Sequence, residues 1–217
     1  MNHAAHSLRS QLYLISPTDV SGSFPERLRR AIDAGEGLVS AFQFRVKNIE
    51  QHEAARLAAP LQKICAEHDV GFIVNDDVAL ARRLGADGVH LGQGDGSVRD
   101  AREQLGEGAQ IGVTCHNSRH LAMEAGDQGA DYVAFGAFFP SSTKVSEHRA
   151  EVELLEFWQK LFELPCVAIG GITPANCGPL VASGADFLAV SGAIWRADEA
   201  AAVRDFAKAI NEASSAG

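Results

Sequence analysis

The sequence predicts a single-domain (β/α)8 TIM barrel spanning residues 1–217. Its 217 residues, 46% of them apolar, are enough to bury one large core. Short apolar runs alternate with amphipathic stretches along the chain, and a Gly-Ala-Asp triplet recurs before three of the runs. Eight strand-then-helix units in one domain are typical of this barrel, whose functional residues follow the carboxyl ends of the strands.

The apolar runs predict strands because each is too short for a typical helix and is bounded by turn residues. In chain order the predicted strands are 12–15, 41–45, 72–74, 88–91, 110–113, 132–135, 167–169 and 187–190. The amphipathic stretches between them predict helices, for example at 25–34, 50–68, 98–105, 118–128, 152–162, 174–182 and 198–210. A doubly wound sheet is less favoured, because residues 92–96 lack the third glycine of a dinucleotide-binding fingerprint.

The Gly-Ala-Asp triplets lie at 85–87, 129–131 and 184–186, each after a helical stretch and before a short strand. Their separations correspond to about two βα units of roughly 20 to 30 residues each. This repeat indicates an even, alternating build. Residues 1–7 and 213–217 are predicted to be flexible tails of small residues.

Composition excludes several classes of function. A net charge of −9 and a pI near 5.3 argue against nucleic acid or an anionic membrane as the main partner. No stretch has the continuous apolar core of a signal peptide or the length of a membrane span, so we expect a cytoplasmic protein. The four cysteines show no zinc-like spacing and are expected to be reduced core residues. The oligomeric state stays open, a homodimer included.

Two carboxylates follow neighbouring predicted strands. Asp76 comes after strand 72–74 and Asp95 after strand 88–91, so both should lie at the same end of the barrel. Adjacent carboxylates repel each other unless a positive charge lies between them. Hard oxygen ligands beside phosphate-binding groups suit Mg²⁺ better than a soft metal.

Gln43, Arg45 and Lys47 alternate with apolar residues in the second predicted strand. Alternation places them on the opposite face from the apolar set, which would pack against the helices. An amide, a guanidinium and an ammonium group directed into the barrel require an anion, because burial of unpaired charge is costly. The alternative interpretation is that the two cations pair with Asp76 and Asp95.

Two further segments are suited to bind phosphate. The loop at 140–149 is rich in hydroxyl groups and is suited to close as a lid, with a plain solvated loop as the alternative. The glycine-containing turns at 169–173 and 190–193 let backbone amides approach a ligand, as in the usual phosphate cradle of this barrel. Two anion-binding regions at one barrel end favour joining two phosphorylated substrates over isomerising one.

After the fifth predicted strand, Cys115 and His116 suggest a nucleophile and its base. Neighbours on an extended strand point to opposite faces, however, and do not easily contact each other. Thr114 is the better candidate for substrate contact and Cys115 the better core residue. His90, within the fourth predicted strand, is expected to be a core histidine with its hydrogen bonds satisfied.

Six motifs, in order, resemble those of the thiamine-phosphate synthase family over nearly the whole chain. Residues 43–47 resemble Q-x-R-x-K, 75–76 N-D, 88–95 G-V-H-x-G-Q-x-D, 112–116 G-V-S-x-H, 140–144 P-T-x-T-K and 170–172 G-G-I. The resemblance implies that an aminopyrimidine methyl diphosphate loses diphosphate with Mg²⁺ and its methylene carbon is captured by the ring nitrogen of a thiazole phosphate. The product would be thiamine phosphate.

The resemblance also implies roles for individual residues. The diphosphate would be held by Gln43, Arg45, Lys47, Asn75 and Lys144, and Mg²⁺ by Asp76 and Asp95. The pyrimidine would lie near Thr114, and the thiazole phosphate against Ser141, Thr143, Gly171, Ser191 and Gly192. The matching stretches add Phe44, Val46 and Ser142 to the substrate-binding set. The catalytic groups would be Arg45, Lys47 and Lys144.

The chain departs from the family pattern at three positions. Thr114 and Ser141 exchange serine and threonine and keep the hydroxyl, whereas Gly192 replaces a common serine and removes one side-chain contact. The alternatives are a thiazole tautomerase-like paralogue, a non-catalytic phosphate-ligand-binding barrel and an unrelated sugar-phosphate isomerase. A tautomerase resembles this chain poorly at the diphosphate site.

Overall fold

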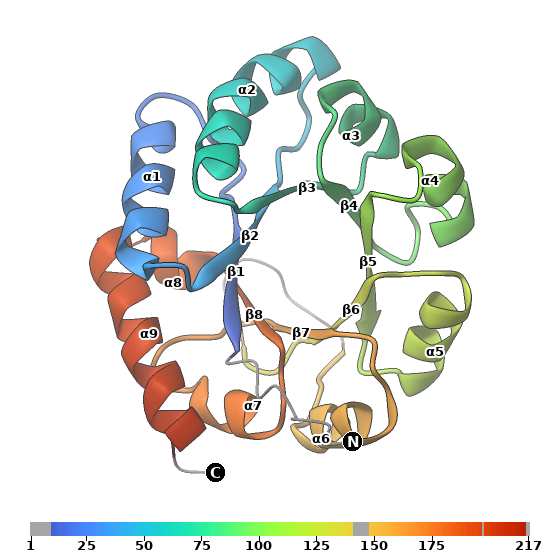
Figure 1. Cartoon of the computed structure of the whole chain (residues 1–217), viewed down its shortest axis with the longest axis vertical. Helices are drawn as coiled ribbons and strands as arrows, with labels where there is room; N and C mark the ends of the chain where they lie inside the picture. Colours follow the sequence, from blue (N-terminus) through green and yellow to red (C-terminus); the bar gives the residue numbers. More distant parts are fainter. Residues whose placement is uncertain (1–9, 141–147, 197, 216–217) are drawn as a thin grey trace, which may run out of the picture.

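Eight parallel strands close into a barrel with the helices arranged around it, which confirms the predicted fold (Figure 1). The computed structural model describes residues 10–140, 148–196 and 198–215. The strands pair in sequence order, and β8 returns to pair with β1. They are β1 (Gln11–Ile15), β2 (Val39–Phe44), β3 (Gly71–Asn75), β4 (Gly88–Leu91), β5 (Gln110–His116), β6 (Tyr132–Gly136), β7 (Cys166–Ile169) and β8 (Phe187–Val190).

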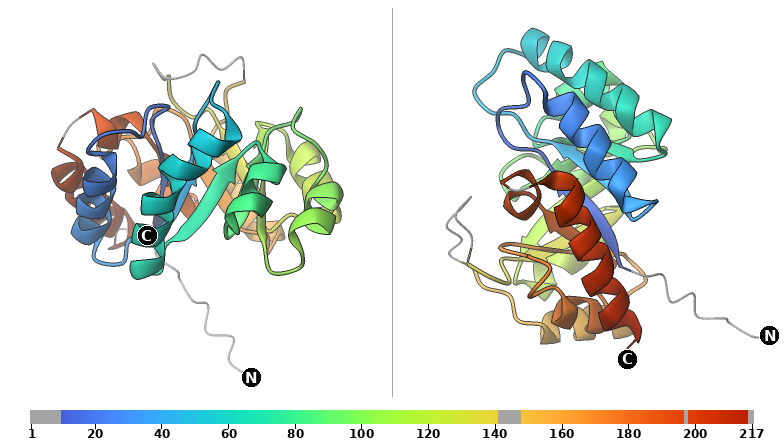
Figure 2. Two further views of the ribbon diagram at one scale, coloured as in Figure 1. Left: turned by 90° about the horizontal axis from the view of Figure 1, so that it is seen from above. Right: turned by 90° about the vertical axis from the view of Figure 1, so that its left-hand side faces the viewer.

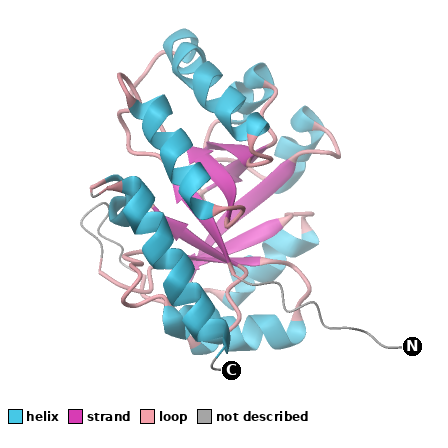
Figure 3. Ribbon diagram, turned by 60° about the vertical axis from the view of Figure 1, so that its left-hand side comes forward, coloured by secondary structure: helices cyan, strands magenta, loops and turns pink. Residues whose placement is uncertain are grey.

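Helices cover the outer face of the barrel, as the view coloured by secondary structure shows (Figure 3). They are α1 (Phe24–Gly35), α2 (Gln51–Glu67), α3 (Val78–Leu84), α4 (Val98–Leu105), α5 (Arg119–Asp127), α6 (Glu153–Leu161), α7 (Gly178–Ala182), α8 (Gly192–Trp195) and α9 (Glu199–Ser215). Helix α9 includes residues 213–215, which the sequence places in a tail. In the described part of the chain, no helix combines the length and the apolar character needed to cross a bilayer.

Strand alternation divides the apolar residues into two layers. Tyr13, Ile73, Tyr132 and Val167 belong to a small cluster inside the barrel. The other set, which includes the stacked rings of Phe44 and Phe72, belongs to the larger core between strands and helices. The cluster inside the barrel is therefore small, and most of the buried apolar residues lie between the strands and the helices.

The three Gly-Ala-Asp triplets each perform the same structural task. Their glycines have positive φ, between 58° and 90°, and end α3, α5 and α7. Each alanine amide then bonds back to a helix carbonyl, and each aspartate carboxylate accepts a hydrogen bond from the amide of the preceding odd-numbered strand. The strand partners, at 2.7 to 2.8 Å, are Phe72, Ile111 and Cys166. The repeat thus fastens each even strand to its odd neighbour at the end opposite the functional residues.

The first helix, α1, lies beside the last helix, α9 (Figure 2). Glu199, only 5% exposed, receives hydrogen bonds from Arg27 and Arg30 of α1. Two guanidinium groups on one buried carboxylate satisfy its charge. This ion-pair cluster ties the last helix to the first.

Candidate active site

The carboxylates predicted to be neighbours do lie side by side at the carboxyl ends of β3 and β4. Asp76 directly follows β3, and its amide donates a 2.8 Å hydrogen bond to the carbonyl of His90 in β4. Its φ of 65° lies in the left-handed region, which turns the chain sharply at the strand end. The Asp76 carboxyl group is hydrogen-bonded to that of Asp95.

The environment of Asp76 favours its protonated form. Burial raises the pKa of this carboxyl group, and the negative charge and hydrogen bond of Asp95 raise it further. The positive charge of Lys47 and a hydrogen bond from Asn75 act in the opposite direction without cancelling the rise. The pair therefore carries unbalanced negative potential that a cation would relieve.

Strand β2 ends at Phe44, so both Arg45 and Lys47 follow the strand, whereas the predicted strand 41–45 included Arg45. Arg45 is half-buried and Lys47 exposed, and neither forms an ion pair with a described residue. The amide of Arg45 donates a 2.9 Å hydrogen bond to the hydroxyl of Ser16, which follows β1. The cations thus lie on an anchored segment at the barrel end and are not paired off by Asp76 and Asp95.

Gln43 is an inward-facing residue of β2 and is 4% exposed. Its side-chain nitrogen donates to the Tyr13 hydroxyl at 3.1 Å. Phe44, by contrast, packs on Phe72 at a ring distance of 5.7 Å, and Val46 packs against the outer core. The side chains of Phe44 and Val46 therefore face the helices, and only their backbone groups remain for the substrate-binding role that the motif assigns them.

Thr114 lies in β5 and is half-buried, with its hydroxyl 2.8 Å from His90 Nε2. Burial lowers the pKa of His90 to about 4, so its ring is neutral near pH 7. The neighbouring Cys115 is fully buried, and burial raises the pKa of its thiol to about 12. Cys115 is thus a core residue, and the expectation of a hydrogen-bonded core histidine at position 90 is confirmed.

The glycine turn after β7 packs against the chain that follows β6. Gly171 has a φ of 62°, and a Cβ there would lie 2.4 Å from the Pro140 carbonyl oxygen. This close approach requires glycine for steric reasons, whatever ligand the amides bind. Ser191 and Gly192 lie at the start of α8, which the sequence does not predict, and both are half-buried. The turns after β7 and β8 thus lie on neighbouring strands.

Four predicted site residues lie outside the described part of the chain: Ser141, Ser142, Thr143 and Lys144. The chain is described again from His148, whose ring lies 4.4 Å from that of His116 at the end of β5. Asn117 also donates a 3.1 Å hydrogen bond to the Arg149 carbonyl. These contacts fix the far end of the loop beside β5.

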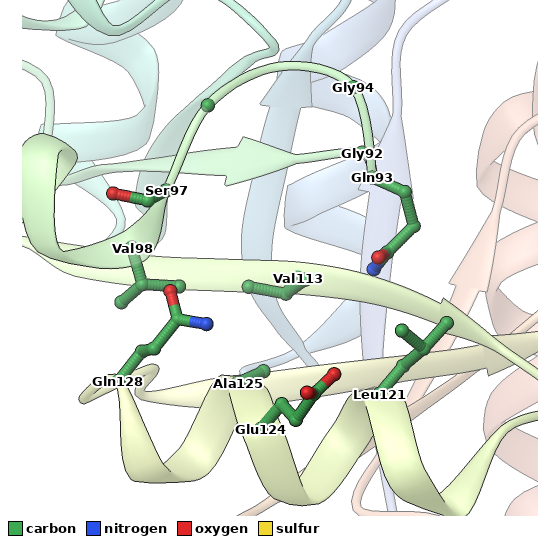
Figure 4. A pocket seen from close by; sticks show the side chains of 11 residues that line it. Gly92, Gln93, Gly94, Ser97, Val98, Val113, Leu121, Glu124, Ala125 and Gln128 are labelled. Atoms are coloured by element: carbon green, nitrogen blue, oxygen red, sulfur yellow. The ribbon is translucent and has the colours of Figure 1, made fainter.

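A surface cavity of about 430 Å³ lies between the β4–α4 loop and α5 (Figure 4). Its lining includes Gln93, Ser97, Leu121 and Gln128 but neither of the paired carboxylates. Gln93 borders it and donates a 2.6 Å hydrogen bond to the Thr114 carbonyl. The cavity lacks the cationic side chains that a phosphorylated ligand requires. We therefore place the candidate site at the strand ends.

Three residues near the site are not identified from the sequence: Ser16, Tyr13 and Tyr132. Ser16 holds the backbone of Arg45, and the two tyrosine hydroxyls contact each other at 2.9 Å inside the barrel. The sequence shows only that Tyr13 and Tyr132 are polar residues in otherwise apolar predicted strands. It does not show that their hydroxyl groups meet and so connect β1 to β6.

The chain is similar to known proteins along most of its length. The sequence model of the family described as thiamine monophosphate synthase matches residues 12–194. A thiamine-phosphate synthase of Erythrobacter litoralis is 68% identical over 209 residues, which cover 95% of this chain and 98% of the relative. One of Rhodospirillum centenum is 50% identical over 199 residues, covering 90% and 95%.

Solved structures agree with this similarity. The thiamine phosphate pyrophosphorylase from Pyrococcus furiosus has a TM-score of 0.82 at 31% identity, covering 95% of this chain and 98% of that one. A 3-hexulose-6-phosphate synthase has a TM-score of 0.63 at 18% identity, with coverage of 91% and 99%, and shares the fold alone.

Proposed function

Because the chain belongs to the thiamine monophosphate synthase family, we propose that the carboxyl ends of its strands bind a pyrimidine diphosphate and a thiazole phosphate together with Mg²⁺. The chain catalyses thiamine phosphate synthesis as a transferase of thiamine biosynthesis. We further propose that it acts in the cytoplasm.

The observation that carries the metal proposal is the contact between the carboxyl groups of Asp76 and Asp95, which adds to the rise in the pKa of Asp76 caused by its burial. Mg²⁺ commonly binds through one or two carboxylates and completes its coordination with water and substrate phosphates. Among the described residues no cluster of three or more His, Cys, Asp or Glu side chains is suited to a metal, so an all-protein cage is not available there. The donor set fits Mg²⁺ held partly by the diphosphate. When bound, the ion would neutralise charge on that group.

The cationic side chains would act on the leaving group. In the proposed reaction the bond between the pyrimidine methylene carbon and the diphosphate oxygen breaks, and its electron pair stays on the diphosphate. The lone pair of the thiazole nitrogen then forms the new carbon–nitrogen bond, so no protein base is needed. Arg45, Lys47 and Lys144 would stabilise the developing negative charge more in the transition state than in the ground state.

The remaining groups would position the two substrates. Gln43 and Asn75 would hold the diphosphate beside the ion, and Thr114 would contact the pyrimidine from β5. On the other side of the barrel, the turns that contain Gly171, Ser191 and Gly192 would hold the thiazole phosphate, and the hydroxyl groups of Ser141 and Thr143 would also bind it. Ser142 would belong to the substrate-binding set. This division leaves the nucleophilic nitrogen facing the methylene carbon.

A direct assay tests the proposal. The purified protein is mixed with both substrates and Mg²⁺, and thiamine phosphate and diphosphate are measured. We expect both products in equal amounts and neither after chelation of the metal. Consumption of the thiazole alone would instead identify a tautomerase, and binding without turnover would identify a silent phosphate-binding barrel.

A further inference from the structure

A continuous chain of hydrogen bonds crosses the interior of the barrel beneath the candidate site. Gln43 Nε2 lies 3.1 Å from the Tyr13 hydroxyl, which lies 2.9 Å from the Tyr132 hydroxyl. Tyr132 is 3.1 Å from His90 Nδ1, and His90 Nε2 is 2.8 Å from Thr114 Oγ1. The chain connects β2, β1, β6, β4 and β5 and so joins a residue on the diphosphate side to one on the pyrimidine side.

The packing around this chain leaves its members little freedom. Tyr13 is 3% exposed, His90 6% and Tyr132 8%. The Tyr13 and Tyr132 rings meet edge to face at 6.0 Å, and the His90 ring stacks on Tyr132 at 5.6 Å. Apolar side chains such as Val167 fill the rest of the layer. Hydrogen bonds in such a dry environment are strong, and an unsatisfied one is costly.

Proton counting then fixes the direction of every hydrogen bond. The Gln43 amide nitrogen is only a donor, so the single Tyr13 proton must go to the Tyr132 oxygen. The Tyr132 proton in turn must go to His90 Nδ1, which leaves the His90 proton on Nε2 and directed at Thr114. The Thr114 hydroxyl proton is not used by any hydrogen bond of this chain, so it can be donated to a group outside it.

The reverse direction fails. If His90 carried its proton on Nδ1, the Tyr132 oxygen would have to accept it, and one of the two tyrosine protons would be left without an acceptor in the chain. A doubly protonated ring produces the same conflict. Among the described residues no buried side-chain nitrogen or oxygen lacks a hydrogen-bond partner. The direction from Gln43 to Thr114 is the one in which both tyrosine protons and the His90 proton have an acceptor within the chain.

We propose that Tyr13, Tyr132 and His90 are positioning residues that hold Gln43 in place and fix the Thr114 hydroxyl as a hydrogen-bond donor toward the pyrimidine substrate. The inference rests on the proposed function for the location of that substrate. It adds a specificity: the ring atom facing Thr114 must be an acceptor, such as an unprotonated ring nitrogen. A ring with an N–H at that place would meet a second donor and bind poorly.

The first test measures the tautomer of His90 and needs no substrate. Nitrogen-15 NMR distinguishes a protonated Nε2 from a protonated Nδ1, and the His90 signals are assigned by their loss in His90→Gln. We expect protonated Nε2 in the wild type and a mixture of tautomers in Tyr132→Phe, which removes the donor to Nδ1. Protonation on Nδ1 in the wild type would overturn the proposal, and so would an unchanged tautomer in the variant.

The second test separates positioning from general stability. Tyr13→Phe should raise KM for the pyrimidine diphosphate or lower kcat/KM for it by about tenfold, the effect of about one hydrogen bond, while KM for the thiazole phosphate stays constant. Val167→Ala, in the same layer but outside the chain of hydrogen bonds, is the matched control. It should lower thermal stability without producing this split or changing the tautomer. Equal losses toward both substrates in Tyr13→Phe would overturn the proposal. If the wild type forms no thiamine phosphate, the proposed function fails, and the tautomer result still decides the hydrogen-bond chain.

Discussion

The carboxylate of Asp95 accepts a 2.8 Å hydrogen bond from the amide of Gly92, three residues earlier in the same loop. This bond closes the turn after β4 and directs Asp95 toward Asp76, across the gap between two strand ends. The loop therefore depends on one Asp95 oxygen for its shape, and the pair depends on the carboxylate for its charge. Substitutions can separate these two roles.

Asp95→Asn should keep the loop and abolish the metal response. An asparagine oxygen can still accept the Gly92 hydrogen bond, but it removes one of the two charges that would hold Mg²⁺. We expect turnover to fall by about 100-fold or more, and Mg²⁺ to lose its ability to raise the melting temperature.

Without metal, the same variant should be at least as stable as the wild type. Burial still raises the pKa of Asp76, but the negative charge of Asp95, which adds to that rise, is gone. Asp95→Ala serves as the comparison, because it loses the loop hydrogen bond as well and should be less stable. Equal stabilisation of wild type and Asp95→Asn by Mg²⁺, measured by calorimetry, would contradict the metal site.

Lys47→Ala should weaken binding of the pyrimidine diphosphate far more than that of the thiazole phosphate. Lys47 acts electrostatically on Asp76 but forms no ion pair with a described residue, so its charge remains available to an anionic ligand. A loss of about tenfold in affinity corresponds to roughly 1.4 kcal/mol. Isothermal titration with each substrate measures the two affinities. Lys208→Ala, on α9, is the control and should change neither affinity; parallel losses in Lys47→Ala would refute the two-subsite division.

The tyrosines should resist ionisation while the barrel is folded. Burial raises the pKa of Tyr13 to about 12 and raises that of Tyr132 well above its usual value. These are the only two tyrosines in the sequence, so tyrosinate absorbance reports on the barrel interior alone. We expect no tyrosinate signal in the native protein at pH 10 to 11, and half-ionised tyrosine near pH 10 after unfolding in urea.

The same shift predicts alkaline instability. A folded pKa above the unfolded value gives stability that is present below about pH 10 and is lost as the pH rises toward about 12, since the unfolded chain releases its protons first. The loss should approach 1.4 kcal/mol per pH unit for each tyrosine. Urea unfolding at a series of pH values measures it, and Tyr13→Phe should show a shallower decline. A tyrosinate signal that appears near pH 10 without unfolding would show that the interior is wet.

Asp131→Ala should destabilise the barrel without altering the substrate affinities. Asp131 accepts hydrogen bonds from the Ile111 amide at 2.7 Å and from Arg102 at 2.6 Å, at the end of the barrel opposite the site. Removing this acceptor leaves two donors without their partner, which costs about 1 to 3 kcal/mol. Chemical denaturation measures the free energy of unfolding, and Asp127→Ala, an exposed aspartate of α5, should be near neutral. A similar small effect in both variants would mean that the clamp contributes little.

Gly171→Ala should reduce both stability and activity. A Cβ would lie 2.4 Å from the Pro140 carbonyl oxygen, and the φ of 62° disfavours any other residue. Relief of the clash must displace either the turn after β7 or the segment leading to loop 141–147. We expect a loss of stability of about 1 to 3 kcal/mol, with a raised KM for the thiazole phosphate. Gly108→Ala, where a Cβ meets nothing within 4 Å, is the control. Normal stability in Gly171→Ala would show that the backbone there adjusts freely.

The sequence by itself determined the barrel and the approximate composition of the site. Short apolar runs bounded by turn residues located the strands, because burial on both faces of a parallel strand leaves a continuous apolar run that is easy to recognise. The carboxylates were predicted to be neighbours because parallel strands bring consecutive C-terminal loops together, which is a property of the topology alone. The direction of Gln43 followed from its alternation with apolar residues.

Tertiary structure decided what alternation cannot specify. Whether Arg45 lies within β2 or just after it depends on where hydrogen bonding to β1 and β3 stops, and Ser16, the residue after β1, fixes that point. The meeting of Tyr13, Tyr132 and His90 depends on the stagger with which the barrel closes. Periodicity records which face each residue occupies, but not its height relative to residues on distant strands. The hydrogen-bond chain that joins the two sides of the site therefore exists only in the closed barrel.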